Sequence, residues 1–235
     1  MVEVVDLAEV RRLLGEDRAQ LVEALPRAEY EEEHLPGALS LPLKEIGPEP
    51  PRVLDPARPV IVYCYDWLCD MSPRAAARLA SLGLARVYDY AAGKVDWLAH
   101  GLPREGTSAA RPYAGDLARR DVATCRLGDT IGDASERVGP DARDLCLVLD
   151  ADGVLHGRLG AAALSADPSA PVESLMEPGP IRHRANAPVE GLPQARPRAR
   201  RFIVTTPRGR LLGVLSRAEA EGALAAPRSR AQGGD

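Results

Sequence analysis

Aromatic residues are scarce in this 235-residue chain, at 4% of the total with one Phe and two Trp. Its cores must therefore rest on Leu, Val, Ile and Ala, which an apolar fraction of 45% allows. A basic excess is also absent: the net charge of −4 gives no reason to expect nucleic-acid binding. The length is enough for two domains of ordinary size.

Long apolar runs are absent too, since none approaches the roughly 20 residues that span a membrane. The first residues, MVEVVDLAEVRRLL, are acidic and amphipathic and lack the basic-then-apolar order of a signal peptide. We therefore expect a cytoplasmic protein with no membrane partner and with mostly reduced thiols.

Cysteine is likewise rare. The four present are too few and too irregularly spaced for a disulfide scaffold: Cys64, Cys69, Cys125 and Cys146. The C-x4-C spacing of the first two is neither a zinc-knuckle nor a thioredoxin spacing. No second Cys/His pair lies nearby in the sequence, so we expect no metal site.

The first half alternates predicted strands and helices. Residues 60–64 (VIVYC) form a continuous apolar run, typical of a strand buried on both faces. A helix is predicted at 73–82, with Pro73 near its start and Gly83 just after its end. Further helices are predicted at 6–14, 28–33 and 94–100, and strands at 19–25, 39–41 and 86–90. This order predicts an α/β fold with a mostly parallel sheet covered by helices.

The second half repeats one pattern after a small, polar linker at 109–114. The first copy has a helix at 131–138 and strands at 145–149 and 154–159; the second has a helix at 187–192, strands at 201–205 and 211–215, and a helix at 216–224. The strand pairs lie about 56 residues apart, which indicates an internal duplication. Residues 226–235 are expected to be disordered.

Cys64 ends the predicted buried strand, and a loop then leads into a helix. Ligands of open α/β sheets bind at the carboxyl ends of strands. Positive potential at a helix N-terminus lowers a thiol pKa and stabilises a bound anion. The position therefore suits a thiolate nucleophile or a persulfide. The alternative is a buried structural cysteine, because free Cys is among the most buried residue types.

Three ordered segments resemble the rhodanese-like family: EYEEEHLPGALSLPL, VIVYCYDWLCDMSPRAAARLASLGL and VYDYAAGKVDWLAHGLPREG. The resemblance implies a rhodanese-like domain over residues 1–108. It implies that Cys64 carries sulfane sulfur as a persulfide, taken from a donor and passed to a thiophilic acceptor. It also implies that the backbone amides of residues 65–70 cradle that sulfur, and that no cofactor is required.

The expected active-site loop departs from the family pattern and is about two residues longer than in compact rhodaneses. Its site residues are Tyr65, Asp66, Trp67, Leu68, Cys69, Asp70 and, in the helix, Arg74. Asp66 and Asp70 oppose thiolate formation and repel thiosulfate, and Arg74 offsets one of them. We therefore predict poor thiosulfate activity and a preference for a neutral or protein-bound persulfide donor. The acidic loop also argues against a phosphatase or arsenate reductase.

Other residues of the first half have two interpretations. Cys69 either resolves an oxidised Cys64 into a disulfide or packs the loop. His34 is a general base or, as we favour, fixes the H-x-P-G-A turn by hydrogen bonds. Trp97 is expected in the core. Glu23 stands where the family has Asp-Val-Arg, which predicts a weaker salt-bridge network.

The duplicated half resembles a tandem pair of CBS domains over residues 115–225, split at about 170. The segments are DTIGDASERV, DLCLVLDADGVLHGRL, MEPGPI, APVEGL and RRFIVTTPRGRLLGVLSRAE. The resemblance implies a homodimer and an adenosine nucleotide ligand: AMP, ATP or S-adenosylmethionine. Gly213 and Ser216 match the ligand motif and Glu219 stands where the motif has Asp, which weakens the expected ribose contact, while the first repeat lacks both polar groups. The alternative is a pair that only dimerises.

Two functions remain open at this point. In one, a sulfurtransferase is regulated or dimerised by its CBS pair. In the other, the rhodanese-like domain is idle and the chain is a nucleotide-sensing or interaction module.

Overall fold

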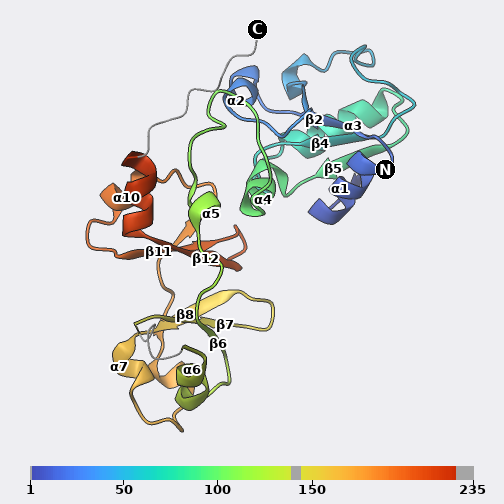
Figure 1. Ribbon diagram of the computed structural model, residues 1–235. Helices are drawn as coiled ribbons and strands as arrows, with labels where there is room; N and C mark the ends of the chain where they lie inside the picture. Colours follow the sequence, from blue (N-terminus) through green and yellow to red (C-terminus); the bar gives the residue numbers. More distant parts are fainter. Residues whose placement is uncertain (1, 139–143, 226–235) are drawn as a thin grey trace. The chain divides into compact units, whose positions relative to one another are not determined.

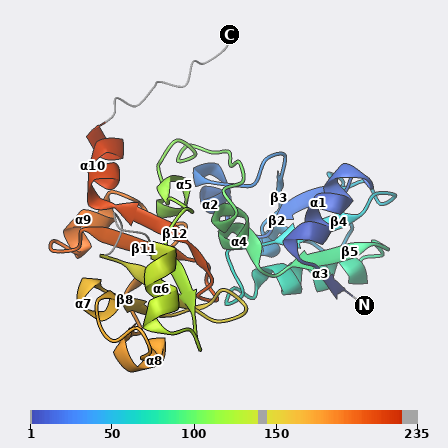
Figure 2. The same cartoon turned by 60° about the horizontal axis from the view of Figure 1, so that its bottom comes forward.

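The computed structural model describes residues 2–138 and 144–225, and Figures 1 and 2 show its ribbon in two views. The chain forms two compact units, unit 1 (Met1–Arg111) and unit 2 (Pro112–Asp235). The tail expected to be disordered, 226–235, lies outside the described residues. In the part of the chain that is described, no helix has the length and apolarity needed to cross a membrane.

Unit 1 is built on five strands: β1 (Glu3–Val4), β2 (Gln20–Glu23), β3 (Leu39–Ser40), β4 (Val60–Tyr63) and β5 (Val87–Tyr90). They form one sheet in the order β1-β5-β4-β2-β3. Every neighbouring pair is parallel. The parallel α/β sheet predicted from the sequence is therefore confirmed.

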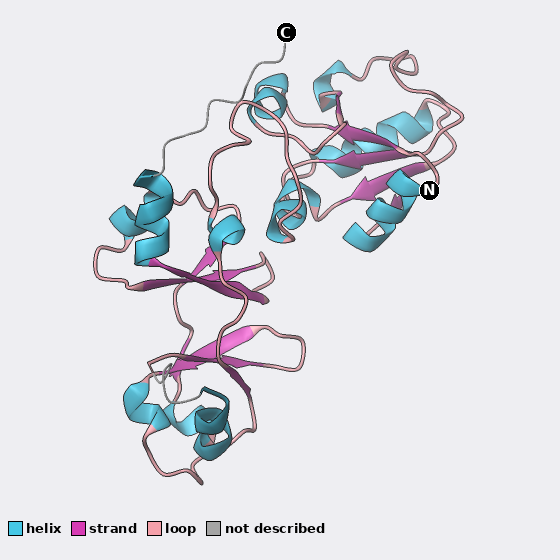
Figure 3. Ribbon diagram, viewed as in Figure 1, coloured by secondary structure: helices cyan, strands magenta, loops and turns pink. Residues whose placement is uncertain are grey.

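Helices cover both faces of this sheet (Figure 3): α1 (Leu7–Gly15), α2 (Arg27–Glu32), η1 (Leu43–Glu45), α3 (Met71–Ser81) and α4 (Gly93–Ala99). On one face, Ile61 and Tyr63 of β4 join a core with Trp97 of α4. On the other face, Val60 and Val62 pack with helix α3. Alternate residues of β4 thus enter two cores, which explains its uninterrupted apolar run.

Helix α3 begins at Met71, two residues before the predicted start at Pro73. Proline is tolerated in a first helical turn because its missing N–H would have no intrahelical acceptor there. The helix ends before Gly83, whose φ of +96° favours glycine. The early start brings Ser72 into the first turn of α3, facing the sheet.

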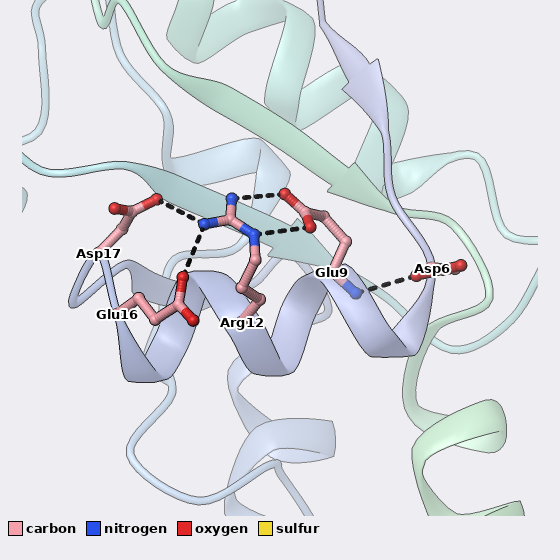
Figure 4. A network of polar contacts seen from close by, with 5 residues as sticks. All are labelled: Asp6, Glu9, Arg12, Glu16 and Asp17. Carbon is pink, nitrogen blue, oxygen red and sulfur yellow. Dashed lines mark hydrogen bonds and ion pairs between the residues drawn. The ribbon is translucent and has the colours of Figure 1, made fainter.

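Helix α1 is stabilised by local polar contacts (Figure 4). Asp6 is its N-cap and accepts a hydrogen bond from the Glu9 backbone N–H at 2.9 Å. The Arg12 guanidinium pairs with Glu9 at 2.6 Å, Glu16 at 3.2 Å and Asp17 at 3.5 Å. The Arg12 pairing lowers the pKa of Glu9. This network is exposed, so its role is local bracing of the helix.

Unit 2 carries shorter elements. Its strands are β6 (Thr124–Arg126), β7 (Cys146–Leu149), β8 (Leu155–Leu159), β9 (Glu177–Pro178), β10 (Arg182–Arg184), β11 (Arg201–Thr205) and β12 (Leu211–Ser216). Its helices are α5 (Ala114–Leu117), α6 (Ile131–Val138), α7 (Ala161–Leu164), α8 (Val172–Leu175), α9 (Gly191–Ala195) and α10 (Arg217–Ala225). The strands form two sheets, β6-β7-β8-β9 and β10-β11-β12.

The duplication seen in the sequence recurs in the backbone of unit 2. Each copy pairs its first two strands in parallel and its hairpin antiparallel. Both hairpins shift register at matching places, between Val148 and Leu149 and between Val204 and Thr205. Apolar residues of the two sheets share one core: Leu147, Leu155, Ile203 and Val214. Each copy also has a short first strand, β6 in one and β10 in the other, which pairs with the hairpin. These strands were too short for the sequence pattern to predict.

Candidate active site

Cys64 lies at the carboxyl end of β4, immediately before the loop that leads into α3. Its thiol is free and the residue is fully buried. Strand β4 lies between β2 and β5, so the cysteine ends an inner strand of the sheet. The sequence predicted this placement, and it puts a single sulfur at the strand edge where ligands of α/β sheets bind.

The Cys64 sulfur lies beside polar groups of Ser72 and Cys69. It lies 3.2 Å from the Ser72 hydroxyl oxygen and 3.4 Å from the Cys69 carbonyl oxygen. Burial, and secondarily a hydrogen bond with the Cys69 side chain, raise the pKa of the thiol to about 12, against the lowering effect of the Ser72 hydroxyl and N–H. At neutral pH the resting side chain is therefore a thiol, and a reaction at this sulfur requires removal of its proton.

The loop after Cys64 is organised by Asp66. The Asp66 carboxylate accepts from the Leu68 N–H, and the Asp66 carbonyl accepts from the Cys69 N–H. Asp66 is buried, whereas Trp67 is 47% and Leu68 86% exposed. Two of the amides expected to cradle the sulfur, those of Leu68 and Cys69, thus donate to Asp66 instead.

Asp70 and Arg74 lie at the start of α3, exposed, and form an ion pair at 3.2 Å. Asp66 and Asp70 were expected to raise the pKa of Cys64. In the structure the cause is burial together with Cys69, so the direction agrees and the physical reason differs. The predicted offset of one carboxylate by Arg74 takes the form of this surface pair.

A glycine turn fixes the backbone at the cysteine. The N–H of Lys94 donates to the Cys64 carbonyl and that of Val95 to the Tyr65 carbonyl, each at 3.0 Å. Gly93, at φ +63°, allows this approach, because a Cβ atom there would lie 2.6 Å from the Cys64 carbonyl oxygen. The start of α4 therefore holds the first two residues of the active-site segment in place.

The departure from the family pattern at Glu23 predicted a weaker salt-bridge network, and the structure shows a buried ion pair there. The Glu23 carboxylate pairs with the Lys94 ammonium at 3.0 Å, and both side chains are buried. Lys94 also donates to the Glu33 carbonyl. Burial raises the pKa of Glu23, while Lys94 and the Tyr63 hydroxyl oppose that rise. A buried ion pair thus replaces the expected network, beside the segment that holds Cys64.

His34 lies in the turn where backbone fixing was predicted. Its Nδ1 is 2.6 Å from the Tyr30 carbonyl oxygen, and its ring stacks on Tyr30 at 3.8 Å between centroids. Its Nε2 lies 3.3 Å from the Glu105 carboxylate, and His34 and Glu105 also exchange backbone hydrogen bonds. These contacts occupy both ring nitrogens, which favours the structural interpretation over a general base.

Sequence reasoning missed two polar residues at the site, Ser72 and Asp89. Ser72 falls in the loop before the helix predicted at 73–82 and was given no role, although it touches the Cys64 sulfur. Asp89 lies in β5 and is buried, with its Oδ1 atom lacking a hydrogen-bond partner within the described residues. A charged residue inside the apolar segment VYDY was the signal that could have identified it.

In unit 2, Ser216 and Glu219 line a cleft of about 730 Å³. The Ser216 N–H donates to the Glu219 carboxylate at 2.9 Å, and the Glu219 N–H donates to the Ser216 hydroxyl at 3.1 Å. This reciprocal pair is a capping box at the start of α10 and lowers the pKa of Glu219. The S-x-x-E pattern therefore has a structural role besides the predicted ligand contact.

Gly213, the third residue of the predicted ligand motif, does not line this cleft. A Cβ atom there would lie 2.3 Å from the Arg119 carbonyl oxygen, so glycine is required for close packing of two backbones. The cleft residues also include Arg119, Arg137 and Arg201. Arg201 pairs with Asp144 at 2.6 Å, and Arg137 pairs with Asp129.

The remaining cysteines, Cys125 and Cys146, are buried in the core of the first repeat and are free. Within residues 2–138 and 144–225, no group of three or more His, Cys, Asp or Glu side chains is placed to hold a metal ion.

Comparison with known proteins separates the two units. The family model of the rhodanese-like domain matches residues 6–100. A curated relative, HTH-type transcriptional regulator Rv0324 of Mycobacterium tuberculosis, is 35% identical over 95 residues, which are 40% of this chain and 39% of that protein. The chain thus spans about two fifths of the relative that it matches.

Solved structures similar to the rest of the chain are CBS-pair domains. One belongs to the putative Mg²⁺ transporter SO5017 of Shewanella oneidensis (18% identity, 48% of this chain, 70% of that chain, TM-score 0.43). Another is CBSX2 in complex with AMP (22% identity, 48% of this chain, 96% of that chain, TM-score 0.42).

A parallel sheet with a buried cysteine at the carboxyl end of an inner strand defines unit 1 as an α/β domain with a thiol site. The family match then identifies this part of unit 1, residues 6–100, as a rhodanese-like domain.

Proposed function

We propose that unit 1 carries sulfane sulfur as a persulfide on Cys64. The observation that supports this most directly is the free thiol at the end of β4, in contact with the first turn of α3 and within a rhodanese-like domain. Helix N-termini stabilise anionic sulfur, and the remaining loop amides supply donors. The partners of the reaction are a sulfur donor and a thiophilic acceptor.

The donor class follows from the surroundings of the sulfur. None of the side chains that perturb the Cys64 thiol is cationic, and Arg74 is paired with Asp70. A doubly charged anion such as thiosulfate would therefore lose its hydration at this buried site, and no cationic side chain there would offset that cost. We assign a neutral or protein-bound persulfide donor, with Trp67 and Leu68 exposed on the loop as apolar contacts for it.

Intact-mass measurement tests the proposal. After incubation with polysulfide and removal of excess reagent, we expect one added sulfur atom on the chain, localised by peptide mapping to Cys64. Cys64→Ser must lose this adduct, and Cys69→Ser, changed in the same loop, must retain it. Absence of an adduct on the unchanged protein would reject sulfur carriage. The alternative would then stand, in which the rhodanese-like domain is idle and the chain is a nucleotide-sensing or interaction module; the name of the curated relative, a transcriptional regulator, favours such a regulatory role.

Unit 2 carries a second candidate function, binding of an adenosine nucleotide in the cleft of about 730 Å³. The supporting observation is that three arginines line the same cleft as Ser216 and Glu219 at the start of α10, and that Arg119 lies close enough to Glu219 to lower its pKa. Isothermal titration with AMP, ATP and S-adenosylmethionine tests it. Arg119→Gln should weaken binding, whereas Arg120→Gln, exposed and outside the cleft lining, should not.

If none of the three ligands binds, unit 2 serves dimerisation alone. Sedimentation of the full chain tests the homodimer. A monomer at micromolar concentration would reject this role.

A further inference from the structure

Two buried polar groups, Ser72 and Asp89, lie on the sheet face of the reactive sulfur. In the parallel register, Val62 of β4 lies opposite Asp89 of β5. Cys64 is two residues beyond Val62, so its side chain and that of Asp89 occupy the same sheet face, the one covered by α3. Ser72, in the first turn of α3, is fully buried there.

The contacts connect these groups in order. The Cys64 S–H donates to the Ser72 hydroxyl oxygen at 3.2 Å. Because that oxygen accepts, the hydroxyl proton of Ser72 remains to donate, and the buried Asp89 carboxyl, whose pKa the Ser72 hydroxyl lowers, is the acidic group on the same sheet face. Asp89 is only 3% exposed, and its Oδ1 is without a hydrogen-bond partner among the described residues. A buried carboxylate oxygen with no donor is a strong proton acceptor.

We propose that Asp89 takes up the Cys64 proton through Ser72 when the sulfur becomes a nucleophile. The S–H bond breaks and its electron pair stays on sulfur. Its proton moves to the Ser72 oxygen as the hydroxyl proton of Ser72 moves to the Asp89 carboxylate. One negative charge passes from Asp89 to Cys64, and no oxidant or reductant is consumed. This proton transfer would activate the sulfur in the proposed sulfur carriage, and it rests on that function only because both require Cys64 to react.

The acid–base properties of the site agree with this relay. Burial raises the pKa of Asp89, as it raises that of the thiol, so Asp89 is a stronger base than an exposed aspartate. The side chains that perturb the two groups are Ser72 for both and Cys69 for the thiol. Ser72 touches the sulfur, while Asp89 acts through Ser72 and is a positioning residue.

Alkylation of Cys64 by iodoacetamide, from about pH 6 to about pH 9, tests the relay. Peptide mapping gives the rate at Cys64 alone. We expect Asp89→Asn to slow labelling at neutral pH by about tenfold or more and to remove a rise in rate with pH that the unchanged protein shows. Ser72→Ala should slow labelling of Cys64 by a similar factor, and the double variant should be little slower than either single variant. Ser72→Thr, which keeps a hydroxyl, should recover the rate.

Faster labelling of Cys64 in Asp89→Asn would overturn the proposal. If Asp89 is only a nearby negative charge, Asp89→Asn lowers the pKa of the thiol and labelling becomes faster. An unchanged rate would overturn it as well. Tryptophan fluorescence confirms that each variant is folded, and Ser72→Ala serves as the second variant if Asp89→Asn is not. Because alkylation uses no sulfur donor, loss of the relay is distinguishable from absence of a persulfide in the mass experiment.

Discussion

Removal of the Lys94 ammonium should destabilise unit 1 strongly. In Lys94→Met the aliphatic stem is largely kept, but Glu23 loses its only cationic hydrogen-bond donor among the described contacts. Glu23 is fully buried, so its charge cannot be solvated by water. Breaking a buried pair by removing one partner costs about 3–5 kcal/mol, a large part of the roughly 5–15 kcal/mol that holds a typical domain.

Urea unfolding followed by tryptophan fluorescence measures this loss. Both tryptophans, Trp67 and Trp97, lie in unit 1, so the signal reports unit 1. Lys44→Met is the matched control, because Lys44 is the only other lysine of the chain and is exposed. The control should change the free energy of unfolding by no more than about 0.5 kcal/mol.

The loss should also depend on pH. The folded pKa of Glu23 is raised by burial, and without Lys94 it is raised further. A carboxyl with a raised folded pKa contributes stability at low pH that is lost as pH rises through that pKa. The Lys94→Met defect should therefore be smallest in acid and grow toward neutral pH, and Glu23→Gln added to it should recover part of the loss. A defect below about 1 kcal/mol, or one independent of pH, would refute the reasoning.

Three further predictions concern the sites. Steady-state assays should show that thiosulfate is a poor sulfur donor compared with polysulfide; comparable turnover would contradict the role given to burial. Gly93→Ala should lower the unfolding free energy by about 1–3 kcal/mol and alter Cys64 labelling, because the new Cβ meets the Cys64 carbonyl; unchanged values would contradict the close approach. Ser216→Ala should cost about 1 kcal/mol in thermal unfolding followed by circular dichroism, through loss of the capping box, whereas Ser165→Ala, after α7, should cost less.

The sequence predicted most of unit 1 because its signals were local. The apolar run of β4 and the Gly stop after α3 both fix elements within a few residues. The relation of Ser72 to Asp89 could not be read in this way, because it depends on the register of β4 against β5 and on the rotation of α3. The pairing of Glu23 with Lys94 joins residues 71 positions apart, so only the folded chain reveals it.

In unit 2 the duplication was visible because strand-turn-strand patterns repeat at a fixed spacing. The motif at Ser216 and Glu219 shows the limit of that approach. The same residue types at the same spacing cap a helix here and also fit the predicted ligand motif, so the sequence alone does not separate the two roles. Short strands such as β10 owe their existence to pairing with β11 rather than to their own composition.

The complete burial of Cys64 has a kinetic consequence. A sulfur that has no accessible surface meets another molecule only when residues around it move, and the Cys69 carbonyl, 3.4 Å from the sulfur, belongs to the 65–70 segment. In the proposed sulfur carriage, the same burial would shield a persulfide on Cys64 from small thiols in bulk solvent. Selectivity among donors and acceptors is then exercised by whatever can hold the segment open, and the residues that face outward from it, Trp67 and Leu68, are where such a molecule would take hold.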